Sequence, residues 1–427
     1  MGRLWLYMLM AKKAIDSEDN ALSRLRKKWL ALALGQFLLI CFGFLILRIW
    51  WEPQFSSLWA GMAGLFSLVF LGQLRSELKL NTRPGDNKIL PHFGAGNILT
   101  IWRGFVIALL IGFLITPWPT GWLAWLPGLL YSIAALADLF DGYLARRFDH
   151  ATLLGERLDL SLDGLGVLIA SILLVKYGQV PVWYLLVGMA RYLYIGGIWL
   201  RQKSGKKVYD LRESPTRRPF AGAQMGFIAV VLFPVFSPPG TYLAAAFFAI
   251  PFLIGFIADW LVVSGMENLV IMNIFPLGSY LKSDPKIERF FQSWIEKVLK
   301  DWLPLFVRVV LVFMLLVWIE RSLMGLFPLQ SNSSINIPLA SSLPGIWLVG
   351  LFVFTSTGIV LIALGAAGRF AAILVLFGVG IYTRFFGLTP IEVLLVTGSA
   401  LLFYLGSGPY SIWNPERFLI SGRLGEV

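Results

Sequence analysis

The sequence has 427 residues, of which 57% are hydrophobic and 15% aromatic, and its mean hydropathy is +0.74. This composition excludes a water-soluble globular protein, and apolar runs of about twenty residues, each long enough to cross a bilayer as a helix, recur along the chain. The formal net charge of +12 does not indicate a nucleic-acid partner, because basic loops mark the cytoplasmic face of membrane proteins. The single cysteine, Cys41, excludes an intrachain disulfide and a cysteine metal cluster.

The predicted membrane spans fall into three groups along the chain. The first group is a pair of helices, Leu30–Trp50 and Leu58–Leu74, joined by the turn EPQFSS. The polar stretch RSELKLNTRPGDNK follows, and its proline, glycine and charged residues interrupt a helix. We therefore predict that residues 1–90 form an N-terminal cytoplasmic segment, two transmembrane helices and a linker.

The second and third groups predict a six-helix domain over residues 91–265 and a four-helix membrane domain over residues 303–427. The six spans are about Leu99–Pro117, Leu123–Phe140, Leu158–Val175, Val182–Leu200, Phe220–Phe236 and Tyr242–Ser264. The four spans are about Leu303–Ile319, Leu343–Leu364, Phe370–Phe386 and Ile391–Leu405. The predicted fold is an all-α, polytopic membrane helical bundle of about twelve transmembrane helices.

Residues 266–302, between the second and third groups, carry an amphipathic pattern. Apolar residues recur at helical spacing within DPKIERFFQSWIEKVLKDWL, at Ile287, Phe291, Trp294, Ile295 and Val298. This pattern favours an interfacial helix that lies on the cytoplasmic membrane surface with its lysines among the headgroups. The alternative is an ordinary linker helix packed on protein.

The distribution of basic residues predicts the orientation. If the N-terminus is cytoplasmic, nearly all Lys and Arg residues fall in cytoplasmic segments, and only about four fall outside, as the positive-inside rule requires. Those four are Arg48, Lys176, Arg321 and Arg384. We therefore expect a multi-pass protein of the plasma or inner membrane, with the cytoplasmic ends of two consecutive central helices carrying a cluster of acidic residues.

This acidic cluster is the stretch DLFDGYLARRFDHATLLGERLDLSLDG, which holds six of the 24 acidic residues of the chain. Asp138 and Asp141 are spaced i,i+3 at the end of one predicted helix, and Asp159 and Asp163 are spaced i,i+4 at the start of the next, so each pair shares a helix face. Four converging carboxylates at membrane depth would repel each other unless a cation lay among them. Hard divalent cations such as Mg²⁺, bound together with substrate phosphates, fit such oxygen ligands. The alternative is that these aspartates cap helix ends and face water.

The spacing D-x-x-D-G-x-x-A-R-x8-G-x-x-x-D-x-x-x-D runs without a gap through the cluster. Its fixed positions are Asp138, Asp141, Gly142, Ala145, Arg146, Gly155, Asp159 and Asp163. This pattern resembles the signature of the CDP-alcohol phosphatidyltransferase family, which are integral membrane enzymes with six transmembrane helices. The stretch GNILTIWRG adds to the resemblance, because family members commonly open the first helix with Asn, Thr and Arg spaced as Asn97, Thr100 and Arg103 are here. The resemblance covers residues 91–265.

The resemblance implies a transferase of the EC 2.7.8 type in phospholipid biosynthesis. Such enzymes displace CMP from a CDP-linked donor by an acceptor hydroxyl and form a phosphodiester. Two divalent cations, Mg²⁺ or Mn²⁺, about 4 Å apart, neutralise the diphosphate and stabilise the entering and leaving oxygens. The resemblance implies that Asp138, Asp141 and Asp159 are metal ligands, and that Asp163 is the general base and also a metal ligand.

A second set of residues is implied for binding the CDP moiety. The members of this set are Asn97, Thr100, Gly142, Ala145, Arg146 and Gly155. The two glycines and the alanine lack bulk, which would let the cytidine and diphosphate approach the backbone closely. Arg146 either binds a phosphate or pairs with a motif aspartate.

Candidates for binding the acceptor are Arg191, Arg217 and Arg218. Arg191 lies within an apolar run, where an ionisable residue is by default functional or ion-paired. Positive-inside anchoring is the alternative for Arg217 and Arg218. Related enzymes that use glycerol phosphate carry a Gly-Lys-x-Lys-Thr-x-x-Gln stretch here, of which this chain keeps Gln224 and the basic character of Arg218, so the acceptor is not predicted by this stretch.

The predicted function is transfer of a phosphatidyl group from CDP-diacylglycerol to an acceptor alcohol, such as a polyol or polyol phosphate, with release of CMP on the cytoplasmic side. The expected partners are these two substrates and membrane lipids, with a homodimer as an option. The first alternative is transfer of a CDP-linked head group onto a lipid alcohol. The second is a non-catalytic transporter or scaffold.

The C-terminal stretch YLGSGPYSIWNPERF resembles the ending of four-helix DoxX-like membrane proteins and says little about chemistry.

Overall fold

The computed structural model describes residues 2–86, 88–147, 152–211, 217–266, 302–326, 345–406, 408 and 411–413, and the statements below concern these residues. They form α-helices and short 3-10 helices, and no β-strand occurs in this part of the chain. The first eight α-helices are α1 (Gly2–Trp50), α2 (Pro53–Ser76), α3 (Ala95–Ile111), α4 (Leu126–Arg147), α5 (Leu153–Lys176), α6 (Leu185–Lys203), α7 (Arg217–Val231) and α8 (Gly240–Val263). The C-terminal helices are α11 (Leu303–Leu326), α12 (Gly345–Leu364), α13 (Gly368–Phe386) and α14 (Pro390–Leu405).

The helices confirm the prediction of an all-α, multi-pass membrane protein, because each predicted span coincides with one of them. Seven helical stretches are long and apolar enough to cross a membrane. They are Glu18–Trp50, Pro53–Ser76, Ala95–Ile115, Leu153–Lys176, Gly240–Val263, Leu303–Ser322 and Gly368–Phe386. Three further predicted spans coincide with the shorter apolar helices Phe220–Val231, Val349–Leu364 and Pro390–Leu405.

The first two helices are longer than the predicted spans. Helix α1 begins at Gly2 rather than near Leu30, because the basic segment before the span contains good helix formers and no proline. Helix α2 begins at Pro53, inside the stretch predicted as a turn. Proline is favoured in the first helical turn, where its missing N–H is not needed, so the turn shrinks to the residues around Glu52.

The chain divides into two compact units. One contains Met1–Gly178, Val182–Tyr192 and Met225–Pro234, and the other contains Gln179–Pro181, Leu193–Gln224 and Val235–Val427. Helices α1 to α5 thus lie in the first unit, and α8 lies in the second together with α11 to α14. The predicted domain limits at residues 91, 266 and 303 remain predictions.

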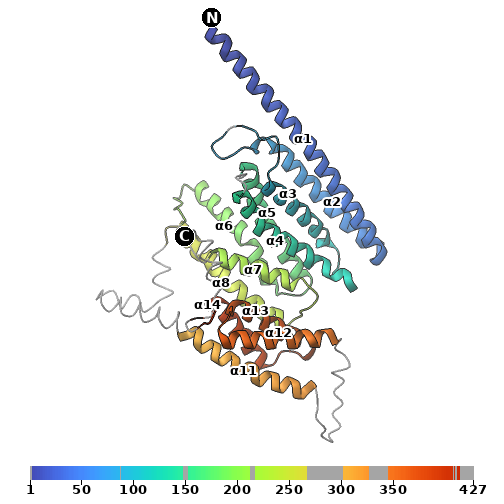
Figure 1. Cartoon of the computed structure of the whole chain (residues 1–427), viewed down its shortest axis with the longest axis vertical. Coiled ribbons are helices and arrows are strands. Elements are labelled where there is room, and N and C mark those ends of the chain that lie inside the picture. Colours follow the sequence, from blue (N-terminus) through green and yellow to red (C-terminus); the bar gives the residue numbers. More distant parts are fainter. Residues whose placement is uncertain are drawn as a thin grey trace, which may run out of the picture. The chain divides into compact units, whose positions relative to one another are not determined.

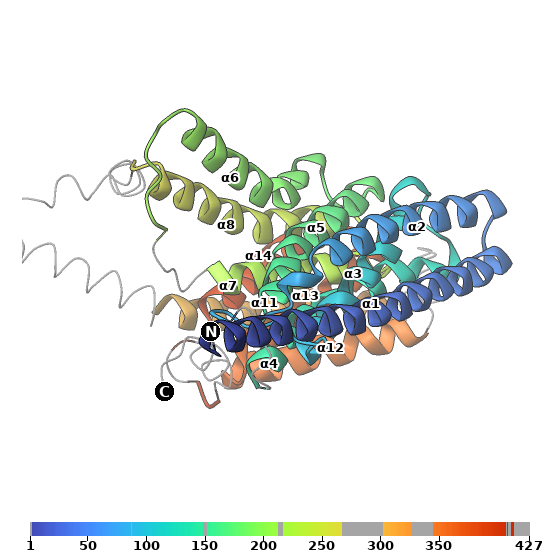
Figure 2. The same ribbon diagram turned by 90° about the horizontal axis from the view of Figure 1, so that it is seen from above.

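Helix α3 forms the core of the first unit, where it packs against α2, α4 and α5. Most of its side chains are buried, including those of Ile101 and Phe105. Helices α1 and α2 run side by side (Figures 1 and 2), and α2 lies against α3. Gly104 on α3 makes this contact close, because a Cβ there would lie 2.3 Å from Cζ of Phe70 on α2.

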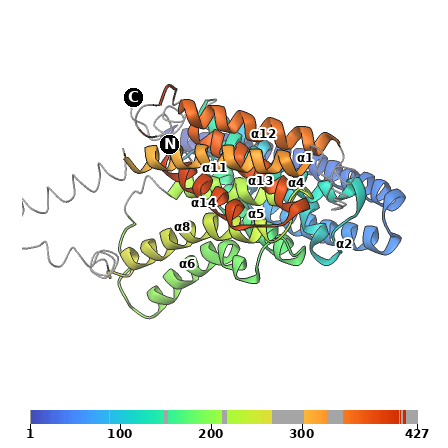
Figure 3. The same ribbon diagram turned by 90° about the horizontal axis from the view of Figure 1, so that it is seen from below.

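The second unit contains a C-terminal bundle in which α13 packs against α12 and α14, and α11 contacts α14 and α12 (Figure 3). Gly378 on α13 lets α12 approach closely, since a Cβ there would lie 2.3 Å from Cγ2 of Thr355. Helix α8 also contacts α13 and α14, and the hydroxyl of Tyr404 donates to the carbonyl of Phe247 at 3.2 Å. These contacts give the bundle its own buried core.

Candidate active site

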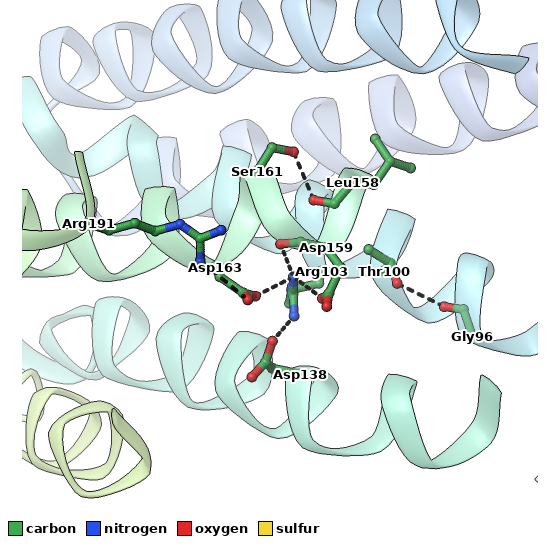
Figure 4. Close-up of polar contacts among 9 residues, drawn as sticks. All are labelled: Gly96, Thr100, Arg103, Asp138, Leu158, Asp159, Ser161, Asp163 and Arg191. Atoms are coloured by element: carbon green, nitrogen blue, oxygen red, sulfur yellow. Dashed lines mark hydrogen bonds and ion pairs between the residues drawn. The ribbon is translucent and has the colours of Figure 1, made fainter. Parts of the chain in front are cut away.

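Three of the four motif aspartates converge in the first unit (Figure 4). Asp138 lies just past the middle of α4, which continues beyond the predicted span to Arg147, and Asp159 and Asp163 lie on the first half of α5. One carboxylate oxygen from each lies within 4.8 Å of the other two. The side chains are 25%, 41% and 36% exposed, respectively, so a ligand can reach carboxylates that lie at the edge of an apolar bundle.

Arg103 on α3 lies at the centre of these carboxylates, as Figure 4 shows. Its Nη2 donates to Oδ1 of Asp159 at 2.7 Å and to Oδ1 of Asp163 at 2.9 Å. Its Nη1 donates to Oδ1 of Asp138. The Arg103 side chain is only 2% exposed. A guanidinium has five N–H donors in a planar fork, so one arginine can satisfy carboxylates from two different helices at once.

The role of Arg103 as a counter-ion was not predicted from the sequence, where it served only as part of the family resemblance. A signal did exist: an arginine inside an apolar run usually pairs with a carboxylate within the bundle. The aspartates with which it pairs lie 35 to 60 residues further along the chain. Only the packing of α3 against α4 and α5 identifies them.

The start of α5 is held by a buried polar network. Thr152 is the N-cap, and its Oγ1 accepts a hydrogen bond from the Gly155 N–H at 3.1 Å. Asn97 on α3 donates from Nδ2 to Oγ1 of Thr152 at 2.9 Å and accepts from it on Oδ1 at 3.0 Å. A Cβ on Gly155 would lie 2.4 Å from Oδ1 of Asn97. The small residue at Gly155 therefore has a packing reason here, besides the close substrate approach that the resemblance implies.

Arg191 on α6 lies on the other side of Asp163. Its Nη1 lies 3.8 Å from Oδ2 of Asp163, and its side chain is 32% exposed. Gly164 makes room for it, because a Cβ there would lie 2.9 Å from Cδ of Arg191. A partly exposed cation therefore lies beside the carboxylate that the resemblance implies as the general base.

The remaining predicted site residues are placed only in part. Thr100 is buried on α3 and donates from Oγ1 to the Gly96 carbonyl at 3.0 Å. Asp141, Gly142, Ala145 and Arg146 belong to the last turns of α4, one to two turns beyond Asp138, and Arg217 and Arg218 begin α7. Their side chains lie outside the described residues, as does nearly all of the predicted interfacial helix.

A comparison with protein families identifies the central part of the chain. Residues 93–262 match the family model described as CDP-alcohol phosphatidyltransferase. The resemblance inferred from the aspartate motif is thereby confirmed for residues 93–262, which we call the phosphatidyltransferase-like domain. Arg103, the three converging aspartates and Arg191 all lie within these matched residues.

Similar proteins of this family are CDP-diacylglycerol–glycerol-3-phosphate 3-phosphatidyltransferases. The chain is 34% identical to that of Salmonella choleraesuis over 85 residues, which are 20% of this chain and 46% of the relative. It is 30% identical to that of Cereibacter sphaeroides over 141 residues, 32% of this chain and 61% of the relative. It is 33% identical to that of Escherichia coli K12 over 85 residues, 20% of this chain and 46% of the relative. The chain thus spans about half the length of the curated relatives it matches. No solved structure matches the chain.

The chemistry of the donor set fits a divalent cation. Mg²⁺ and Mn²⁺ prefer carboxylate oxygens, and oxygens on opposite sides of an octahedral Mg²⁺ lie about 4 Å apart. The three converging oxygens lie within 4.8 Å of one another, so small side-chain rotations would bring them to one ion. Arg103 pairs with the same three carboxylates, and its single positive charge leaves the cluster with net negative charge, which suits a further cation.

Proposed function

We propose that the chain is an integral membrane phosphatidyltransferase that transfers a phosphatidyl group from CDP-diacylglycerol to an acceptor alcohol and releases CMP. The observation that carries this proposal is the convergence of Asp138, Asp159 and Asp163 around Arg103 within the phosphatidyltransferase-like domain. Such a constellation can bind the diphosphate of a CDP-linked lipid through divalent cations. The basic segments on the predicted cytoplasmic side support a site that opens to the cytoplasm.

In the proposed reaction the acceptor hydroxyl attacks the phosphorus that bears the diacylglycerol. A new P–O bond forms there, the P–O bond to CMP breaks, and the hydroxyl proton passes to Asp163. Asp138, Asp141 and Asp159 would hold one or two divalent cations, which supply charge neutralisation of the diphosphate and of the leaving CMP. Asp163 lies one turn deeper in α5 than Asp159, about 6 Å along the helix, which suits a base facing the side opposite the leaving group, as in-line displacement requires.

Arg191 supports an acceptor that carries an anionic group. It lies 3.8 Å from the proposed base and is partly exposed, so a phosphate on the acceptor could pair with it while the hydroxyl faces Asp163. The relatives named above use glycerol 3-phosphate by name. We therefore propose a polyol phosphate as the acceptor class, although the chain keeps only Gln224 and Arg218 of the basic stretch expected for glycerol phosphate.

The test is CMP release by the purified full-length chain in mixed micelles with CDP-diacylglycerol and a panel of labelled alcohols. We expect CMP and a new phosphodiester lipid only when an acceptor is present, with polyol phosphates preferred over uncharged polyols. Turnover with CDP-linked head groups and diacylglycerol instead would support the head-group transferase. If no donor gives CMP release, the proposal that the chain is a phosphatidyltransferase is contradicted.

Chelation tests the metal requirement in the same assay. We expect excess EDTA to abolish CMP formation and added Mg²⁺ or Mn²⁺ to restore it, because the clustered carboxylates alone would repel the diphosphate. Recovery of turnover when metal is returned to chain incubated in EDTA controls for loss of folded protein. Full turnover in excess EDTA would rule out the divalent-cation mechanism.

A further inference from the structure

The segment that precedes the phosphatidyltransferase-like domain is joined to its site by hydrogen bonds. We name residues 77–86 and 88–92 the connecting segment; it follows α2 and precedes α3. Asn81 in this segment is fully buried. Its Nδ2 donates to the carbonyls of Leu90 at 2.8 Å and His92 at 3.0 Å, and its own carbonyl accepts from the Leu90 N–H at 2.8 Å. The two ends of the connecting segment are thereby tied together.

The Asn81 side chain also contacts α3 directly and is linked to α5 through Asn97. Its Oδ1 accepts from Nδ2 of Asn97 on α3 at 2.9 Å. Asn97 in turn exchanges hydrogen bonds with Thr152, the N-cap of α5. Asn97 and Thr152 are each 3% exposed. Because these amide and hydroxyl groups are buried, each partner they lose leaves an unsatisfied polar group, so the geometry of the three is strongly specified.

Two further contacts hold the first turn of α5 to the same segment. The backbone N–H of Leu153 donates to the Thr82 carbonyl at 3.1 Å. The Arg157 side chain pairs with Glu77, with 3.2 Å between Nε and Oε1. Arg157 lies two residues before Asp159 on α5. The connecting segment therefore fixes the part of α5 from which Asp159 projects.

We propose that Asn81 is a positioning residue for the metal-binding aspartates. It locks the α3 N-terminus to the α5 N-cap, and so holds Arg103, Asp159 and Asp163 in register across two helices. The N-terminal extension, which lies outside the matched domain, thus becomes part of the catalytic framework rather than a passive membrane anchor. This inference rests on the proposed function, in that the aspartates are taken as cation ligands.

The test compares Asn81→Ala with Trp59→Phe in the purified full-length chain. Trp59 is a matched control, because its indole Nε1 also ties the N-terminal extension to α3, through the Leu109 carbonyl at 3.0 Å, but about two turns beyond Arg103 toward the other end of α3. Three quantities are measured: Mn²⁺ binding by electron paramagnetic resonance, the kcat and KM for CDP-diacylglycerol, and the thermal midpoint.

We expect Asn81→Ala to raise the Mn²⁺ dissociation constant and lower kcat by about tenfold, the lower end of the effect of losing a group bonded directly to a metal ligand, because Asn81 acts through Asn97 and Thr152. Trp59→Phe should lower the thermal midpoint with the Mn²⁺ dissociation constant within about twofold of the wild type. If the two variants lose thermal stability alike and bind Mn²⁺ alike, Asn81 has a structural role only and the inference is overturned.

A second pair of variants covers the case in which Asn81→Ala does not fold. Thr152→Val removes only the hydroxyl at nearly constant volume, and Thr152→Ser retains it. Weak Mn²⁺ binding by Thr152→Val together with wild-type binding by Thr152→Ser supports the network, and equal binding by both overturns it. A wild-type chain that neither binds Mn²⁺ nor releases CMP overturns the proposed function itself, which is a different outcome from a wild-type chain that does both.

Discussion

Arg103 lies among three aspartates with almost none of its side chain exposed, and it contacts residues of both α4 and α5. Its planar fork satisfies carboxylates that would otherwise repel each other, so it contributes both to the stability of the bundle and to the charge balance of the site. A divalent cation bound at this cluster would act on the same negative charges as the guanidinium. Asp163 differs from its neighbours because it also faces the partly exposed Arg191.

The first prediction concerns which positive charge, that of Arg103 or that of a divalent cation, compensates the negative charge of the aspartates. Arg103→Met keeps much of the side-chain volume and removes the charge, which should cost about 3 kcal/mol or more of stability without metal, because the carboxylates lose their buried partner. We expect Mg²⁺ to raise the thermal midpoint of this variant more than that of the wild type. Arg191→Met, which removes a partly exposed cation that lies 3.8 Å from only one of the aspartates, is the comparison and should show a smaller change in the Mg²⁺ response than Arg103→Met. An equal Mg²⁺ response in Arg103→Met would mean that cations do not bind among these aspartates.

A second prediction separates the roles of the two aspartates on α5. Asparagine keeps the shape and one coordinating oxygen but cannot accept a proton. Asp163→Asn should therefore retain Mn²⁺ and nucleotide binding and lose turnover by about 10²–10⁴-fold, as expected for loss of a general base. Asp159→Asn should instead weaken metal-dependent binding of CDP-diacylglycerol. Near wild-type turnover by Asp163→Asn would show that another group takes the proton.

At the scale of the elements, α3 matters most, because it carries Arg103 and Asn97 and contacts α2, α4 and α5. The approach of α2 depends on two glycines of the 95–115 stretch. A Cβ at Gly104 would lie 2.3 Å from the Phe70 ring, and one at Gly112 would lie 2.4 Å from the Trp59 ring. These rings fill the space that the glycines leave, so the N-terminal hairpin and the domain share one packed core.

The third prediction tests this packing. Gly104→Val should destabilise the chain by about 1–3 kcal/mol, since the added side chain overlaps a buried ring, and it should reduce CMP formation because Arg103 is the adjacent residue. Gly104→Ala should also destabilise the chain, because the added Cβ overlaps the Phe70 ring, and adding Phe70→Leu to Gly104→Ala should recover part of that loss. Gly72→Ala on α2 is the control, because nothing lies within 4 Å of its Cβ position, and alanine favours the helix. Equal stability of Gly104→Val and wild type, measured by thermal unfolding, would contradict the packing argument.

At the scale of the whole molecule, the site and the C-terminal bundle belong to different compact units. Every described residue of the aspartate site lies in the first unit, whereas α8, which the family match includes, lies with α11 to α14 in the second. Within the second unit, a Cβ on Gly240 at the start of α8 would lie 2.9 Å from Oγ1 of Thr383 on α13. The C-terminal helices therefore stabilise a helix of the matched region without contributing a described residue to its carboxylate cluster.

The fourth prediction follows from this division. A chain that ends after residue 282 loses the partners of α8, so its thermal midpoint should fall. The Phe248 ring loses its contact with the Phe403 ring, and the Phe247 carbonyl loses the hydrogen bond from Tyr404. Its Mn²⁺ binding should persist, because Asp138, Asp159 and Asp163 lie in the first unit. The full-length chain in the same lipid serves as the reference. Loss of Mn²⁺ binding in a truncated chain that remains folded would indicate that the C-terminal helices help to form the site.

The sequence alone determined the helical membrane fold and predicted that the aspartates pair on helix faces, because hydropathy and helical periodicity depend on residues close together in the chain. It also identified the family, since the motif from Asp138 to Asp163 lies within one short stretch. Two features were decided only by the tertiary structure: the guanidinium of Arg103 among the aspartates, and the link from Asn81 through Asn97 to Thr152. Their partners lie 16 to 60 residues apart, and which side chains meet across such a separation depends on how the helices pack and in what register.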